Sequence, residues 1–372
     1  MYSQKHDKRD ELRCAYRQHF RKLYHPDDPP SQSRHHNENH DTLANVLASM
    51  GGIPQTPNFQ KWKETYRMEE TNFPGGVWPV MLAPFNKNDE LDYGALEELI
   101  EWYIYNGAAG LFAVCQSTEM FHMSLEERVN YAKFVYEKAL GRVPVIASGH
   151  ISDSFDDQIK EIKAIAATGV DATILITNRL AKQEESDEVW LTNLERLLKE
   201  IPKDIKLGFY ECPYPYKRVL SKELTKYCAD SGRFYFLKDT SCNIENIKSK
   251  LQVCKGTNLK LYNANTATLL ESLKLGAVGY SGVMANMQCS LYAKLCNSYV
   301  SKEVLKLSDE LTICALIERQ LYPPNAKYYL QLEGLNITTN CRVKDEKELT
   351  DTSKSEVQML RRITEHMKKE YL

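Results

Sequence analysis

The chain has 372 residues, of which 42% are hydrophobic and 26% are charged, and its formal net charge is −2 at pH 7. This composition is typical of a soluble globular protein, and the length is sufficient for one large domain with appendages or for two ordinary domains. The small net charge gives no electrostatic reason to expect nucleic acid or an anionic membrane surface as a partner. No uninterrupted apolar run approaches the ~20 residues that a membrane-spanning helix needs.

The ten cysteines are scattered along the chain, and no two of them form a Cys-x-x-Cys pair. A zinc site of the usual local spacing is therefore not expected. The first ten residues are polar and contain no signal-peptide core. Together these features predict reduced thiols and a cytoplasmic protein.

Residues 1–72 differ in composition from the rest of the chain. They contain the sequence Pro-Asp-Asp-Pro-Pro at 26–30 and six of the nine histidines. We expect an N-terminal extension that is poorly ordered or partly helical, with one short helix near 11–23. A metal-binding histidine tract is the alternative interpretation of this segment.

From residue 77 onward, short apolar runs alternate with amphipathic helical patterns. The runs are rich in Val, Ile, Leu, Phe or Tyr, which is typical of strands buried on both faces. They span residues 77–85, 110–115, 144–149, 172–177, 206–212, 234–239, 259–264 and 278–283. The helical patterns between them span residues 93–105, 125–140, 155–168, 189–200, 222–231, 244–251 and 267–275.

Local signals support these helix boundaries. Ser124 with Glu127 forms a capping box, and Ser154 precedes two acidic residues in a first turn. A glycine lies just past each of four helical ends, where a left-handed backbone is favoured. These glycines are Gly107, Gly141, Gly169 and Gly276.

Eight strands that alternate with helices predict parallel crossovers and an α/β fold. The number of units and their length fit a (β/α)₈ TIM barrel over residues 73–300, since such barrels typically have ~250 residues. A doubly wound open sheet usually carries a glycine-rich phosphate loop after its first strand, and residues 86–89 (Asn-Lys-Asn-Asp) contain none. Amphipathic patterns at 302–320, 325–333 and 353–371 predict a C-terminal helical region, 301–372, that packs onto the barrel or onto a second subunit.

Barrel active sites lie at the C-terminal ends of the strands. The predicted sixth strand ends at Lys238. Half-buried at a barrel mouth, this amine would have a pKa lowered by desolvation and could attack a carbonyl; the alternative is a strand-end lysine that simply reaches solvent. The fifth strand ends near Tyr210, which could move the required proton. The loop after the second strand offers the Ser117 hydroxyl and backbone N–H groups to a carboxylate. These groups predict Schiff-base chemistry on a 2-oxo acid, and the strand ends lack the His/carboxylate cluster of a metal-assisted enzyme.

Other polar residues at the strand ends favour structural interpretations. Glu119 is expected to orient its loop by accepting backbone N–H bonds, with general-base catalysis as the alternative. His150 is interpreted as a capping or loop histidine. Asp239 is expected to point away from the side that bears the preceding lysine, because side chains alternate along a strand. Cys115 and Cys212 are expected to be inert packing residues near the mouth, although they could be reactive.

Several segments match one known family in order and spacing over residues 75–345. They are 80–85 with Asp92, 141–149 (Gly-Arg-Val-Pro-Val-Ile-Ala-Ser-Gly), 169–172, Tyr210 with Pro213, Lys238, 276–279 through 285–286, 323–327 and 334–335. On these motifs the chain resembles the dihydrodipicolinate synthase/N-acetylneuraminate lyase family. The resemblance implies a class I, Schiff-base lyase that needs no metal or organic cofactor and assembles as a homotetramer.

The resemblance also implies roles for five residues. Lys238 would form the imine with pyruvate or another 2-oxo acid, and Tyr210 would relay protons during imine formation and carbon–carbon cleavage. Ser117 and Gln116 would bind the carboxylate of the oxo acid. Ser281 would line the site from the eighth strand. The second partner would be an aldehyde.

The chain departs from the family pattern at the substrate-binding positions. Cys115 and Thr118 replace two glycines of a loop in which the family usually has two hydroxyl residues, and Gln116 replaces one of these. Arg179 stands where dihydrodipicolinate synthases have a tyrosine pair; it could bind a second anionic group or lie on the surface. Pro215 stands at the position where the family has an arginine that binds the carboxylate of the second substrate. These departures predict a different aldehyde partner or a dehydration, and leave as the alternative a catalytically inactive barrel with a binding or regulatory role.

Overall fold

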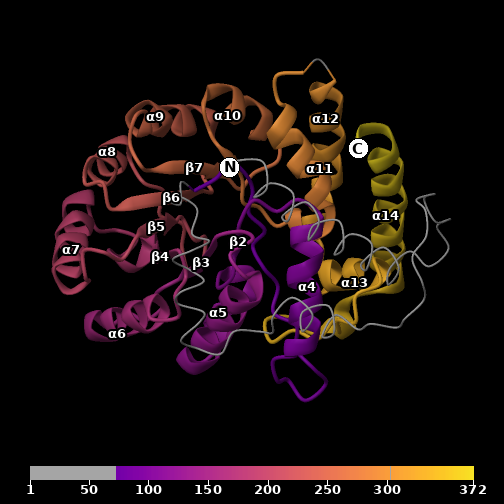
Figure 1. Ribbon diagram of the computed structural model, residues 1–372, viewed down its shortest axis with the longest axis horizontal. Coiled ribbons are helices and arrows are strands. Elements are labelled where there is room, and N and C mark those ends of the chain that lie inside the picture. Colours follow the sequence, from indigo (N-terminus) through magenta and orange to yellow (C-terminus); the bar gives the residue numbers. More distant parts are fainter. Residues whose placement is uncertain (1–72, 302) are drawn as a thin grey trace, which may run out of the picture. The chain divides into compact units, whose positions relative to one another are not determined.

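The computed structural model describes residues 73–301 and 303–372 (Figure 1). The extension predicted for residues 1–72, with its short helix and histidine tract, lies outside these residues. The described part contains eight parallel strands in the order β1-β8-β7-β6-β5-β4-β3-β2. A parallel bridge between Val80 and Phe112 joins the remaining edges, since Met81 donates its N–H to the Phe112 carbonyl at 3.0 Å. The predicted (β/α)₈ barrel is therefore confirmed.

The strands are short and occur at the predicted places. They are β1 (Gly76–Val77), β2 (Leu111–Phe112), β3 (Val145–Ser148), β4 (Ala172–Ile176), β5 (Leu207–Tyr210), β6 (Phe234–Asp239), β7 (Lys260–Asn263) and β8 (Gly279–Tyr280). The first strand is much shorter than the predicted 77–85. Pro79 and Pro84 interrupt it, because proline has no N–H to donate to a neighbouring strand.

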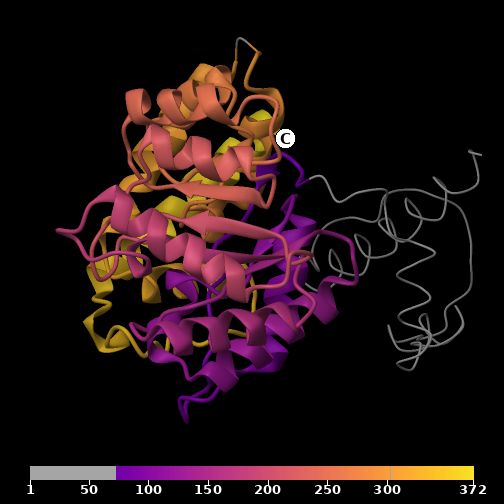
Figure 2. The same ribbon diagram turned by 90° about the vertical axis from the view of Figure 1, so that its left-hand side faces the viewer.

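Helices lie outside the strands in both views (Figure 2). Around the barrel they are α4 (Tyr93–Tyr105), α5 (Leu125–Ala139), α6 (Phe155–Ala166), α7 (Asp187–Glu200), α8 (Lys222–Asp230), α9 (Ile244–Cys254), α10 (Leu269–Leu275) and α11 (Ala285–Ser298). Short 3₁₀ turns are η1 (Gln116–Thr118), η2 (Met120–His122), η3 (Thr177–Arg179), η4 (Ala315–Arg319) and η5 (Glu346–Glu348). Within residues 73–301 and 303–372, no helix is both long and apolar enough to cross a membrane.

The predicted helix signals are present in the structure. The Ser124 and Glu127 capping box starts α5, and the Ser154 side chain accepts the N–H of Asp157 at the start of α6. All four predicted stop glycines have a positive φ, for example 111° at Gly276 after α10. Helix α11 was not among the sequence predictions.

The C-terminal region consists of α12 (Val304–Cys314), η4, α13 (Pro324–Leu332) and α14 (Asp351–Tyr371), and α14 packs against α13 and α11 (Figure 1). Residues 337–343 between α13 and α14, here called the C-terminal strap, bind loops at the barrel mouth. Asn340 donates its side-chain N–H to the Asn86 carbonyl at 2.9 Å, and Arg342 bonds both carboxylate oxygens of Glu127. The strap therefore ties the C-terminal region to the loops after β1 and β2.

Aromatic side chains pack against one another inside the barrel. Phe236 stacks on Tyr262 with ring centroids 4.3 Å apart, and Trp78 lies 5.2 Å from Phe236. Phe112 contacts the same Phe236 ring at 6.0 Å. All four side chains are buried, so the interior is a packed core with no open pore.

Candidate active site

Lys238 lies one layer above this aromatic core, at the C-terminal end of β6. It is paired in register with Tyr210 of β5. Its Nζ lies 4.3 Å from the centroid of the Tyr210 ring and 5.8 Å from that of Phe112, and the residue is 4% exposed. Burial among these rings lowers the pKa of Lys238 to about 8. The nearby Cys115, Cys212 and Glu318 have the opposite, smaller effect. An amine of this pKa is available as a nucleophile near neutral pH.

Tyr210 lies between Lys238 and the loop that follows β2. Its hydroxyl is 3.4 Å from Oε1 of Gln116, a long hydrogen bond, and its ring packs edge-on against Phe112. Burial raises the pKa of Tyr210 well above its ordinary value, with Cys212 and Cys115 adding to the effect. The phenol therefore holds its proton at neutral pH and can donate it to a bound ligand.

The loop after β2 brings two predicted substrate-binding residues to the same place. Gln116 is half-buried, and its Oε1 also lies 3.7 Å from Sγ of Cys212. Ser117 is buried and lies near Tyr322, whose pKa burial raises well above its ordinary value and Ser117 partly lowers. The Thr118 hydroxyl lies 2.6 Å from the Ala113 carbonyl, which fixes the loop at a position where the family has glycine.

Two further residues at this mouth come from the C-terminal region and were missed by the sequence analysis. The Tyr322 hydroxyl accepts a hydrogen bond from Asn286 at 2.9 Å. Glu318 of η4 is half-buried, and burial raises the pKa of its carboxyl, although the charges of Arg319 and Lys238 lower it. Glu318 and Lys238 act on each other's pKa, so a carboxylate lies near the mouth. No motif at a strand end indicated it, because Glu318 follows the last strand.

Ser281 is fully buried, and its Oγ donates to the Trp78 carbonyl at 3.0 Å. This bond ties β8 to the segment after β1. The hydroxyl proton is therefore engaged within the protein, and a ligand could use only the lone pairs of this oxygen.

Glu119 accepts backbone N–H groups, as the sequence analysis favoured. The donors, however, belong to the C-terminal strap and not to its own loop: Arg342 at 2.6 Å and Val343 at 2.9 Å. The buried carboxylate also binds Nζ of Lys327 at 3.2 Å. Glu119 thus joins the loop after β2 to the strap and to α13.

The other predicted structural residues behave as expected. His150 is fully buried, with one ring nitrogen 3.0 Å from Gln158 and the other accepting the Ile176 N–H at 2.8 Å. Burial lowers its pKa to about 4, so the ring is neutral. Asp239 points to the outside of the barrel, where it binds Lys250 at 2.6 Å.

The two cysteines at the mouth are both buried. Burial raises the pKa of the Cys212 thiol to about 11, so this side chain is protonated at neutral pH. A protonated thiol is a poor nucleophile, which favours the interpretation of this residue as inert packing.

Arg179 and two cations that closely follow Pro215 in the sequence, Lys217 and Arg218, have protein partners. Arg179 pairs with Asp153, and its guanidinium lies 5.7 Å from the Phe121 ring centroid. Arg218 pairs with Asp187 at 2.9 Å. Lys217 is exposed and donates to the Thr240 carbonyl at 2.8 Å, two residues beyond Lys238. In residues 73–301 and 303–372, no group of three or more His, Cys, Asp and Glu side chains could hold a metal ion.

A buried lysine beside a tyrosine at the C-terminal mouth of a (β/α)₈ barrel is the arrangement of the class I lyases and aldolases, which form a Schiff base with pyruvate or another 2-oxo acid. Residues 73–366 match the model of the dihydrodipicolinate synthetase family, and the chain belongs to this family.

The similarity to individual relatives is low but extensive. The 4-hydroxy-tetrahydrodipicolinate synthase of Bacillus subtilis strain 168 is 26% identical over 275 residues, which cover 71% of this chain and 90% of the relative. The enzyme of the same name from Oceanobacillus iheyensis is 27% identical over 215 residues, covering 57% of this chain and 70% of the relative.

Solved structures agree in fold. The dihydrodipicolinate synthase DapA-2 of Bacillus anthracis has a TM-score of 0.70 at 19% identity, covering 77% of this chain and 97% of its own. The chloride-inhibited dihydrodipicolinate synthase of Acinetobacter baumannii, solved in complex with pyruvate, has a TM-score of 0.69 at 21% identity, covering 78% and 99%. A monomeric dihydrodipicolinate synthase variant has a TM-score of 0.71 at 19% identity, covering 79% and 97%.

Proposed function

We propose that this protein is a Schiff-base lyase that acts on pyruvate or another 2-oxo acid through Lys238. The observation that carries the proposal is the buried amine with a pKa of about 8, placed beside the Tyr210 ring at the barrel mouth. Pyruvate is the 2-oxo acid in the Acinetobacter synthase complex, which makes it the first substrate to test.

In the proposed reaction, the neutral amine of Lys238 attacks C2 of the 2-oxo acid and forms a C–N bond. As the carbonyl π bond opens, the oxygen takes up a proton and the attacking nitrogen gives one up, which yields a neutral carbinolamine; this then loses water to leave the imine. Tyr210 supports this sequence because its phenol is protonated at neutral pH and adjoins the amine. Gln116 and Ser117 would bind the carboxylate of the acid, and Ser281 would line the site from β8.

The second substrate is proposed to differ from that of the synthases named above. Pro215 replaces the arginine of the family pattern, and Arg218 is engaged with Asp187. The mouth instead has Lys217 at its rim and the Glu318 carboxylate. A different aldehyde, or dehydration of a hydroxylated 2-oxo acid, fits these groups better than the synthase reaction.

The state of the cysteines supports a reducing compartment, since all nine in residues 73–301 and 303–372 are free thiols. We therefore propose a cytoplasmic enzyme. We propose a homotetramer from the family resemblance, and one relative of similar fold is a monomeric variant.

Borohydride trapping tests the proposal. The protein is incubated with pyruvate or larger 2-oxo acids and reduced, and the added mass is located by peptide mass spectrometry. We expect one adduct on Lys238, none in Lys238→Ala, and an unchanged adduct in Lys206→Ala, which removes a lysine just before β5. Absence of an adduct with every 2-oxo acid in the panel would support the catalytically inactive barrel.

A further inference from the structure

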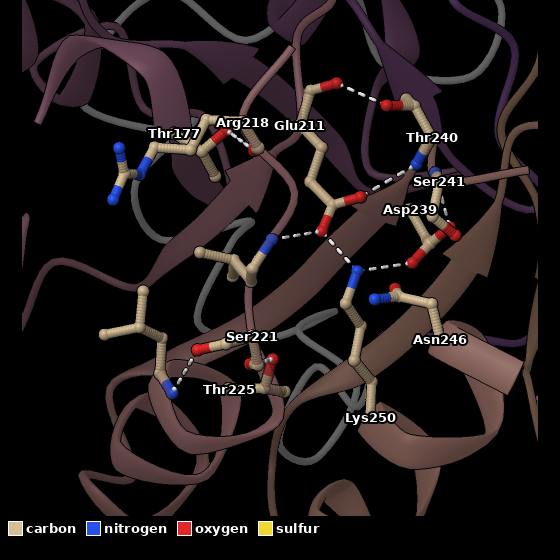
Figure 3. A network of polar contacts seen from close by, with 12 residues as sticks. Thr177, Glu211, Arg218, Ser221, Thr225, Asp239, Thr240, Ser241, Asn246 and Lys250 are labelled. Atoms are coloured by element: carbon tan, nitrogen blue, oxygen red, sulfur yellow. Dashed lines mark hydrogen bonds and ion pairs between the residues drawn. The ribbon is translucent and has the colours of Figure 1, made fainter. Parts of the chain in front are cut away.

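Two carboxylates directly follow the two candidate catalytic residues in the sequence. Glu211 comes after Tyr210 at the end of β5, and Asp239 follows Lys238 at the end of β6. Side chains alternate between the two faces of a strand. The tyrosine and the lysine accordingly pack against the aromatic interior, while both carboxylates point outward to α9 (Figure 3).

One lysine binds both carboxylates. Lys250 lies on α9, and its Nζ contacts Glu211 Oε1 and lies 2.6 Å from Asp239 Oδ2. All three side chains are 0% exposed. A single ammonium group thus connects the ends of β5 and β6 to the same helix.

Both carboxylates also accept hydrogen bonds from other donors. Glu211 accepts the N–H of Leu220 at 2.9 Å and that of Thr240 at 3.0 Å. Asp239 accepts both the N–H and the hydroxyl of Ser241, at 2.9 and 2.7 Å. A buried network in which each charged group has a charged partner favours one arrangement, since each displacement leaves a buried charge without a partner.

The charges of this network depend on Lys250. Burial raises the pKa of Glu211; Lys250 opposes the rise, and Asp239 adds to it. Burial also disfavours the charged form of Lys250, but the two carboxylates outweigh it and raise the pKa of the amine. Lys250 is therefore an ammonium whose charge allows two carboxylates to lie together away from water.

We propose that Lys250 is a positioning residue that sets the relative placement of the Lys238 amine and the Tyr210 hydroxyl from outside the barrel. The proposal rests on the proposed function, in which these two groups act on the same 2-oxo acid. Removal of the ammonium leaves Glu211 and Asp239 to repel each other, and each carboxylate is one peptide bond from a reacting residue.

The test is Lys250→Met, which keeps the length of the side chain and removes its charge. Active sites are counted by the final amount of trapped adduct, so that the trapping rate refers to folded protein only. We expect the first-order rate of imine trapping at saturating pyruvate to fall by about tenfold to a hundredfold, as for a small misplacement of reacting groups. The pyruvate concentration that gives half of the maximal trapping rate should change much less, because Lys250 is placed outside the barrel and not at the site of the acid.

A pH profile separates positioning from a general loss of stability. The titratable groups that face Lys250 are Glu211 from β5, Asp239 from β6 and Cys254 from its own helix. In Lys250→Met the Glu211 carboxyl, whose pKa burial raises and Lys250 no longer lowers, can take up a proton, and it does so increasingly as pH falls. The rate of the variant relative to wild type should therefore rise as pH falls, and the titration of Lys238 cancels in this ratio.

The matched control is Lys368→Met, which removes an ammonium that two carboxylates, Glu333 and Glu365, share on α13 and α14. It should lower thermal stability and leave the trapping rate and the pH ratio unchanged. If Lys250→Met does not fold, Glu211→Gln serves instead, because it keeps the pair of Lys250 with Asp239 and weakens only the connection to β5. A several-fold lower trapping rate is expected for Glu211→Gln.

Two outcomes would overturn the proposal. The first is a wild-type rate and pH profile in Lys250→Met, or in Glu211→Gln if Lys250→Met does not fold. If the wild-type protein forms the Lys238 adduct, this result would overturn the positioning role of Lys250 and leave the proposed function intact. Failure of the wild-type protein to form an adduct with any 2-oxo acid would overturn the proposed function and this inference together.

Discussion

An ammonium group enclosed by aromatic rings loses hydration that the rings replace only in part. Lys238 is in this situation, and its pKa of about 8 is lower than the ordinary 10.5. At pH 7 about a tenth of the folded molecules would have the free amine, against roughly three in ten thousand for an ordinary lysine. The surroundings of this residue thus favour its reactivity at the expense of stability.

The stability cost leads to a prediction for Lys238→Met. Because the folded-state pKa is depressed, the cost is fully present below pH 8 and is relieved as pH rises toward 10.5. The variant should be more stable than wild type by about 2–4 kcal/mol at pH 7, and the gain should shrink above pH 8. Urea unfolding at pH 7 and pH 10 measures this. The exposed Lys203→Met is the control, and a loss of stability in Lys238→Met at pH 7 would contradict the assigned burial cost.

Glu318 provides a second prediction at the scale of single residues. Its carboxylate raises the pKa of Lys238, so Glu318→Gln should move the pH midpoint of borohydride trapping downward from about 8. The free amine is then present at lower pH, and trapping at pH 7 should be faster. Glu310→Gln, on α12, removes a carboxylate that pairs with Tyr371 and Lys306, and it is the control. An unchanged midpoint would show that Glu318 does not act on the lysine.

At the scale of elements, the C-terminal strap depends on one buried carboxylate. Glu119→Ala removes the partner of the buried Lys327 and the acceptor of two strap N–H groups. We expect a loss of about 3–5 kcal/mol of folding free energy, because an unpaired buried charge remains. Chemical denaturation measures it. Glu97→Ala breaks an exposed pair with Lys138 and should cost at most about 1 kcal/mol. Equal losses in the two variants would count against the buried role.

The elements that the sequence predicted well are those with a clear amphipathic period. Helix α4, Tyr93–Tyr105, has the predicted bounds because one face is buried and the other is solvated. The sequence of α11 shows no such contrast between a buried face and a solvated face. Most of its residues are buried, including the polar Asn286 and Gln288, and the backbone at Gln288 is not helical.

The candidate site was predictable where topology alone determines it. Lys238 and Tyr210 end neighbouring parallel strands, so the barrel fold brings them together. Glu318 and Tyr322 come from beyond the last strand, and their approach to the mouth depends on how the C-terminal helices pack. In the sequence, Lys250 occupies a position in an amphipathic helix pattern where an exposed lysine is common. Only the tertiary structure shows that its partners are buried carboxylates.

At the scale of the whole molecule, we expect sedimentation to give about four times the chain mass of 42.8 kDa. Large apolar side chains on α12 and η4 support association, since Ile313 is 68% exposed and Leu316 is 50% exposed. Ile313→Glu should lower the sedimenting mass, whereas the exposed polar change Lys199→Glu should not. A wild-type protein that sediments at the mass of one chain would contradict the tetramer.

The alternation of side chains at the ends of β5 and β6 also limits how this barrel can diverge. A deletion or insertion of one residue within either strand would turn a carboxylate into the aromatic interior and a reacting residue toward α9. Such a change would remove the chemistry and the ionic connection in one step. We therefore expect relatives that gain a new second substrate to vary in the loops beyond the strands and in the C-terminal region, and to inherit Tyr210-Glu211 and Lys238-Asp239 as undivided pairs.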